Sequence, residues 1–176
     1  MTPSERFHKQ IWAALGPLDD AVFEAIAARP PTEAEVRAVE SALDAPLPEA
    51  FMDFSAKSNG LLVVAREACW PQPQEGWVGP AWKLWRGVVL LGFDTEDLPD
   101  WASLVTASQK LQEWGVEGVA PIFKVLGDGE RIWGVDRSGT SVRVSCGEIA
   151  RLDATIAELY AEEILALVDR QMCMHA

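Results

Sequence analysis

The chain has 176 residues, a formal net charge of −12, 49% hydrophobic residues and eight tryptophans. This composition favours a compact globular domain and excludes a largely disordered chain. We expect neither nucleic acid nor a membrane as a partner, because both carry negative charge that an acidic surface repels. The same acidity would also serve solubility alone.

The cysteines and the N-terminus predict a cytoplasmic protein. Cys69, Cys146 and Cys173 are scattered without a CxxC motif, which indicates neither a disulfide framework nor a zinc site. Charges interrupt the first sixteen residues, where a secretory signal would be apolar, and no apolar run is long enough to cross a bilayer. We expect no cofactor.

Residues 1–30 are predicted to form an N-terminal helical extension. Apolar residues recur at helical spacing over 4–15 and, in our interpretation, continue as a second helix over 18–29. The pair Gly16–Pro17 separates the two segments, because neither residue type favours the interior of a helix.

Residues 32–60 are predicted to form a helical hairpin. Thr32 and Glu35 have the spacing of a capping box, in which each side chain bonds the backbone N–H of the other residue. Two prolines bar this helix from continuing and suit the start of the next one. The second helix is expected to end at Asn59–Gly60, since these residue types adopt the left-handed conformation readily.

The segment 61–118 is predicted to alternate short strands with loops. Residues 61–65 and 87–92 are short apolar runs typical of buried strands. Proline, glycine and tryptophan dominate residues 70–86 and indicate an irregular loop. Helical character returns over residues 101–114.

From residue 119 the pattern changes to an antiparallel meander. Strands are predicted over 119–126, 131–136 and 140–145, joined by glycine-containing turns. A closing helix follows, and Asp153 is a candidate for its N-cap. N-terminal helices, a mainly antiparallel sheet with a C-terminal meander and a closing C-terminal helix make a single α+β domain over residues 1–176.

One pattern within residues 32–60 is more specific than its separate features. A glutamate, a leucine, a Leu-Pro pair, two aromatic residues and an Asn-Gly pair follow at defined spacing: Glu40, Leu43, Leu47, Pro48, Phe51, Phe54, Asn59 and Gly60. Together with the meander and closing helix over 119–168, this pattern resembles the SUKH superfamily, which includes bacterial immunity proteins and a yeast regulator of cell-wall assembly. Ser55 and Leu61 depart from the family pattern, where leucine and glycine are common.

The resemblance implies a cytosolic, non-catalytic protein that neutralises a cognate toxin by binding it directly. If that toxin is a nuclease it must be basic to hold phosphates, and an acidic inhibitor would be attracted to it. The resemblance equally allows a regulatory or scaffold domain. A small hydrolase is a third interpretation, against which His8 and His175 lie near opposite ends of the chain and no phosphate-binding motif occurs.

Two loops form the candidate partner-binding face. The loop over residues 70–86 contains four tryptophans, which either cover the edge of the sheet or anchor a partner: Trp70, Trp77, Trp82 and Trp85. The loop over residues 93–101 contains four acids that would attract a basic partner: Asp94, Glu96, Asp97 and Asp100. Such acids are also typical of a solvated helix start, and their spacing does not match a calcium-binding loop, so we expect no metal.

Overall fold

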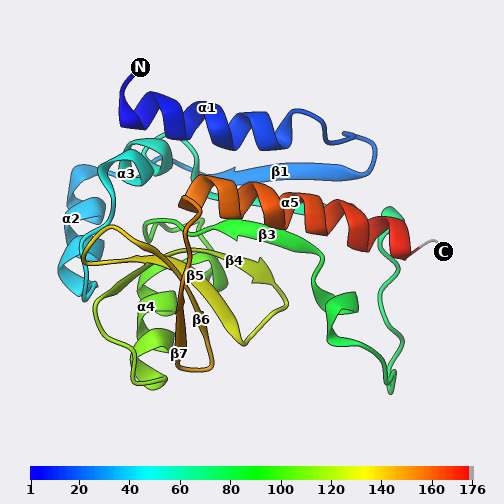
Figure 1. Ribbon diagram of the computed structural model, residues 1–176. Helices are drawn as coiled ribbons and strands as arrows, with labels where there is room; N and C mark the ends of the chain where they lie inside the picture. The colour runs from blue at the N-terminus through cyan, green and yellow to red at the C-terminus, as the bar shows by residue number, and fades with distance from the viewer. Residues whose placement is uncertain (175–176) are drawn as a thin grey trace.

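The computed structural model describes residues 1–174 (Figure 1). Its helices are α1 (Pro3–Leu15), α2 (Glu33–Ala42), α3 (Glu49–Ser55), α4 (Leu104–Glu113) and α5 (Ile156–Cys173). Its strands are β1 (Phe23–Ala28), β2 (Asn59–Ala65), β3 (Gly87–Leu90), β4 (Val119–Leu126), β5 (Arg131–Asp136), β6 (Ser141–Ser145) and β7 (Glu148–Arg151). Three short 3₁₀ helices are η1 (Glu67–Cys69), η2 (Ala81–Leu84) and η3 (Asp100–Ala102).

All seven strands form one antiparallel sheet in which each strand pairs with the next in sequence, from β1 to β7. The α+β fold predicted from the sequence is confirmed. The meander has one more strand than predicted, because β7 follows β6 through a tight turn at Cys146–Gly147, where both residues have positive φ. Most of β7 is exposed, so no apolar alternation marks it in the sequence.

Helices cover both faces of the sheet. Phe123 of β4 stacks on Trp133 and meets Tyr160 of α5 edge-on, so this face carries the closing helix. Lys124, the next residue along β4, lines a cavity with residues of α4, and successive side chains of a strand point to opposite faces. Helix α5 therefore lies on one face and α4 on the other, as Figure 1 shows, with α1 packed against α3 and α5.

Residues 18–29 do not form the predicted helix. Residues 19–22 make a turn in which Asp19 accepts a hydrogen bond from the backbone of Ala21, and Phe23–Ala28 then pairs with β2 at the edge of the sheet. Backbone pairing with β2 therefore outweighs the helix propensity of this alanine-rich segment, which is only a weak determinant.

Two predicted helix ends also differ. Helix α5 is capped by Thr155 in a capping box with Glu158, and not by Asp153, because the helix begins further along the chain. By contrast, the capping box predicted for Thr32 and Glu35 is confirmed at the start of α2. The second end that differs is that of α3. Asn59–Gly60 does not end α3 but begins β2; Gly60 alone of the pair has positive φ.

The helical hairpin places its apolar stripe in the core. Phe51 and Phe54 of α3 are buried, and Leu47 is buried just before the helix begins at Glu49. Phe7 of α1 meets Phe54 edge-on, with ring centroids 5.8 Å apart. These contacts join α1 to α3.

Candidate interaction surface

The two predicted partner-binding loops lie at opposite ends of one strand. Residues 70–86 lead into β3, and residues 93–101 follow it after two further buried residues (Figure 1). The length of β3 lies between the two loops, so the structure does not bring the tryptophan-rich loop beside the acidic loop. The predicted single face is therefore two separate surfaces.

Trp70 belongs to the core and not to a binding face. Its side chain is 1% exposed, and its indole N–H donates a hydrogen bond of 2.9 Å to the backbone carbonyl of Lys83. This bond satisfies the polar atom of a buried ring and folds the loop back on itself. The prediction that Trp70 contacts a partner is wrong.

The other three tryptophans of this loop are half-buried and contact cations of the same chain. The ammonium group of Lys83 lies 5.9 Å from the ring centroids of both Trp77 and Trp82. The guanidinium of Arg131 lies 4.6 Å from the ring centroid of Trp85, and that of Arg170 lies 5.9 Å from it. The contacts of Arg131 and Arg170 with Trp85 hold the loop to its own domain, whereas those of Lys83 lie within the loop.

A cluster of charged side chains lies beneath Trp85 on the α5 face. Arg131 donates to Asp128 at 2.6 Å, and Arg170 pairs with Glu163 at 3.7 Å. Burial raises the pKa of Glu163 and lowers that of Arg170, since it penalises the charged form of each group. This end of the sheet is therefore rich in internally paired charges.

The acidic loop is fastened to the segment that precedes α2. The Asp97 carboxylate accepts a hydrogen bond of 2.9 Å from the backbone N–H of Arg29 and another of 2.8 Å from the hydroxyl of Thr95. The first of these bonds is the largest cause of the lowered pKa of Asp97. Asn59, fully buried, reinforces the junction: its amide donates to the carbonyls of Phe93 and Arg29 and accepts from the Phe93 N–H.

Arg29 is also paired with the first turn of α2. Its guanidinium donates to both carboxylate oxygens of Glu35, at 2.9 and 2.6 Å. This bond, with those from Thr32, lowers the pKa of Glu35 to about 2. The charge of Arg29 is therefore already engaged by an acid of its own chain.

A second junction joins the C-terminal end of the segment 29–44 to the C-terminal end of the segment 93–118. Asp44, just after α2, accepts a hydrogen bond from the backbone N–H of Gly118, and Arg137 donates to the Asp44 carbonyl at 2.9 Å. Because α2 also contacts α4, residues 29–44 and 93–118 lie side by side. We call these two segments the acidic side.

The acidic side concentrates the charge of the protein. It contains ten acidic and three basic residues, a net charge of −7 out of −12 for the whole chain. The predicted acids Asp94, Glu96 and Asp100 are exposed on it. The aromatic residue beside them is Trp101, 39% exposed, which the sequence analysis did not select.

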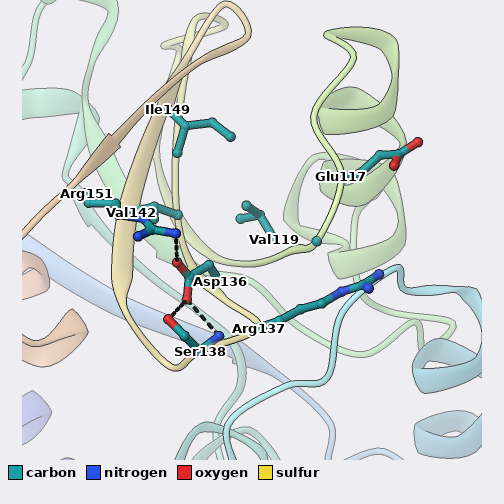
Figure 2. A pocket seen from close by; sticks show the side chains of 9 residues that line it. Glu117, Val119, Asp136, Arg137, Ser138, Val142, Ile149 and Arg151 are labelled. Carbon is teal, nitrogen blue, oxygen red and sulfur yellow. Dashed lines mark hydrogen bonds and ion pairs between the residues drawn. The ribbon is translucent and has the colours of Figure 1, made fainter.

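A groove of about 680 Å³ opens at the end of the acidic side, where β4, β5, β6 and β7 meet (Figure 2). Three apolar residues line it: Val119, Val142 and Ile149. A guanidinium nitrogen of Arg151 lies 3.4 Å from Oδ2 of Asp136, and the two side chains form an ion pair. Figure 2 shows Arg137 extending away from Asp136. Its guanidinium instead donates to the Asp44 carbonyl.

The Asp136 carboxylate is fixed through one of its oxygens. Oδ1 accepts hydrogen bonds from the hydroxyl and the backbone N–H of Ser138 and from the N–H of Thr140. These bonds, the Ser138 hydroxyl first, lower the pKa of Asp136 and keep it ionised. Oδ2 is buried against Arg151 and accepts no hydrogen bond within the described chain.

The residues of this groove were missed by sequence analysis. The order Asp136, Ser138, Gly139 is typical of a turn closed by an aspartate side chain, so the turn itself is predictable. Nothing in the sequence indicates that Arg151, from a strand that lacks apolar alternation, lies opposite Asp136.

A cavity of about 390 Å³ brings Ser4, His8 and Asp53 together between α1 and α3. The Ser4 hydroxyl donates to Asp53, while the His8 ring packs against Phe54 with centroids 5.6 Å apart. Over residues 1–174 no hydrogen bond joins Ser4 to His8, so this trio lacks the contact of a nucleophile with its base. His175 lies outside the described residues.

No protein-family model and no curated protein matches this sequence. Within residues 1–174, no group of three or more His, Cys, Asp or Glu side chains is arranged to hold a metal ion. None of the helices in that range is both long and apolar enough to cross a membrane.

Proposed function

We propose that this protein is a non-catalytic binding protein whose acidic side docks a basic protein. The observation that carries the proposal is the junction of residues 29–44 with 93–118, which gathers more than half of the net charge on one quarter of the chain. Charge concentrated in this way attracts a basic partner and accelerates their encounter.

The acidic side also offers a contact for the docked state. Trp101 is 39% exposed beside Asp100, and tryptophan is enriched among residues that dominate binding energy. Acids around an exposed aromatic ring therefore combine long-range attraction with a short-range anchor. We propose this ring as the aromatic anchor, in place of the tryptophans of loop 70–86.

The specific role that we propose is immunity: the partner is a basic toxin, such as a nuclease, that this protein blocks in the cytoplasm. The resemblance of Glu40, Leu43, Leu47, Pro48, Phe51, Phe54, Asn59 and Gly60 to the SUKH pattern supports this role. A protein that holds phosphates is basic, which agrees with an acidic inhibitor.

The test of immunity is co-expression with the products of the neighbouring genes in a bacterial host. We expect one basic product to arrest growth, and this protein to restore growth and co-purify with it. If no neighbouring product is both toxic and bound by this protein, the immunity role is wrong.

The test of the docking face is association kinetics with that basic product over a salt series. The acidic-side variant replaces four exposed acids whose side chains form no hydrogen bond or ion pair within residues 1–174: Glu33→Gln, Asp94→Asn, Glu96→Gln and Asp100→Asn. We expect slower association and a weaker dependence on salt.

A matched control changes the net charge equally at other places. It replaces four exposed acids of loop 70–86, helix α5 and the turn before β1: Asp20→Asn, Glu75→Gln, Glu162→Gln and Asp169→Asn. Both variants have a net charge of −8. If the control slows association as much as the acidic-side variant, only overall charge matters and this face is not the docking site.

A further inference from the structure

One oxygen of Asp136, Oδ2, has only Arg151 as a partner and becomes accessible when Arg151 moves away. Oδ1 is held by Ser138 and Thr140, while Oδ2 is 3.4 Å from Arg151 and accepts no hydrogen bond within residues 1–174. The Arg151 side chain is 74% exposed, whereas that of Asp136 is 14% exposed, so solvent screens the guanidinium and weakens the ion pair. A second cation can therefore replace Arg151 at low cost, because the carboxylate itself is already fixed.

The apolar lining of the groove suits the stem of a basic side chain. Ile149 is 50% exposed and pairs with Val144, and Arg151 pairs with Val142, so both β7 residues point to the groove face. Lysine and arginine pack their methylene stems on apolar surface while their charged ends make polar contacts. Ile149 offers that surface beside Asp136, above Val142, which is itself fully buried.

The groove is also continuous with the acidic side. Glu117 and Gly118 line it and belong to the segment 93–118, and Arg137 bridges from its rim to Asp44. A basic protein drawn to the acidic side therefore meets the groove at its end.

We propose that this groove anchors an arginine or lysine side chain of the protein partner, with the charged end on Asp136 Oδ2 and the stem on Ile149. The inference rests on the proposed function, since it specifies a contact by which a basic partner is held. It requires that Arg151 be displaced, so Arg151 acts as a competitor for the site.

The experiment titrates the full ¹⁵N-labelled chain with arginine amide, lysine amide and citrulline amide, followed by NMR. Citrulline amide has nearly the shape of arginine amide without its side-chain charge. We expect the two cationic side chains to shift the amide signals of residues 136–142 and 149–151, and citrulline amide to shift them far less. Equal shifts from citrulline amide, or shifts confined to residues 29–44 and 93–113, would overturn the inference.

Three variants of exposed residues test whether the binding is specific to the groove. Arg151→Ala removes the competitor and is expected to tighten arginine amide binding roughly two- to fivefold, the worth of an exposed ion pair. Arg137→Ala removes an equal charge from the rim of the groove. Because the Arg137 guanidinium is bonded to Asp44 and does not compete for Asp136, a smaller increase in affinity is expected. Ile149→Ser leaves the charge unchanged and is expected to weaken binding.

If Arg151→Ala and Arg137→Ala increase the affinity for arginine amide equally, the attraction is a general electrostatic one and the specific site is overturned. Each variant's NMR spectrum reports whether the fold is retained before binding is compared. The result of this titration can be distinguished from the result of the association kinetics that test the docking face. Failure of this titration, with the acidic-side variant still slowing association, removes the groove and leaves the proposed function standing.

Discussion

The backbone N–H of Arg29 donates a hydrogen bond of 2.9 Å to the carboxylate of Asp97, 68 residues further along the chain. This bond places the acidic loop 93–101 against the start of α2. Asn59 stabilises the same junction from within the core, through bonds to Arg29 and Phe93. The proposed docking face therefore depends on a buried amide that contacts no partner.

Replacing Asn59 tests this dependence. Asn59→Ala removes three hydrogen bonds of a fully buried side chain and leaves two carbonyls without that partner. We expect a loss of roughly 2–4 kcal/mol in the free energy of unfolding, measured in urea, and faster amide hydrogen exchange over residues 93–101. Ser58→Ala is the control, because its hydroxyl forms no hydrogen bond within the described residues. Equal effects of the two changes would contradict the role assigned to Asn59.

Trp70→Ala is expected to lower the free energy of unfolding by about 3–5 kcal/mol, because it empties a fully buried position. It also removes the 2.9 Å bond that folds loop 70–86 onto itself. The comparison is Trp82→Ala in the same loop, where the ring is half-buried and the loss should be clearly smaller. Urea unfolding of both variants decides whether Trp70 is structural; similar midpoints would place its ring outside the core.

Stability at acidic pH should depend on Glu35. Its pKa is lowered from 4.5 to about 2 by Arg29 and Thr32, so the unfolded chain takes up the proton first as the pH falls. The stability from this carboxylate is present above pH 4.5 and is lost as the pH falls from there toward 2. We expect wild type to exceed Glu35→Gln in stability at pH 6, and the difference to narrow by pH 3.

Glu33→Gln serves as the control for Glu35, since Glu33 is exposed and forms no ion pair within residues 1–174. Urea unfolding across the pH series measures each variant against wild type. Parallel curves for wild type and Glu35→Gln would mean that the bond between Arg29 and Glu35 does not contribute to stability in solution.

The protein is expected to bind neither duplex DNA nor single-stranded RNA. Affinity for nucleic acid depends on cations that neutralise phosphates, whereas this chain has a net charge of −12. Fluorescence anisotropy of labelled oligonucleotides at low salt is the measurement, with a basic DNA-binding protein as positive control. Saturable binding at micromolar concentration would argue against the acidic inhibitor that we propose.

The sequence by itself determined the features that arise from neighbouring residues. The capping box of Thr32 and Glu35 depends on a spacing of three, and the apolar stripe of Phe51 and Phe54 on the helical repeat. Alternation in residues 141–145 placed Val142 and Val144 on one face of a strand. These local patterns were sufficient to predict the α+β class and most strands of the meander.

Only the tertiary structure decided the features that join distant segments. Residues 23–28 became a strand because β2 pairs with them, and Trp70 became core while Trp82 remained half-buried in a loop of uniform composition. The acidic side and the pairing of Asp136 with Arg151 likewise join residues from separate elements. Local propensity carries no information about such contacts, because they form only when elements far apart in the sequence pack together.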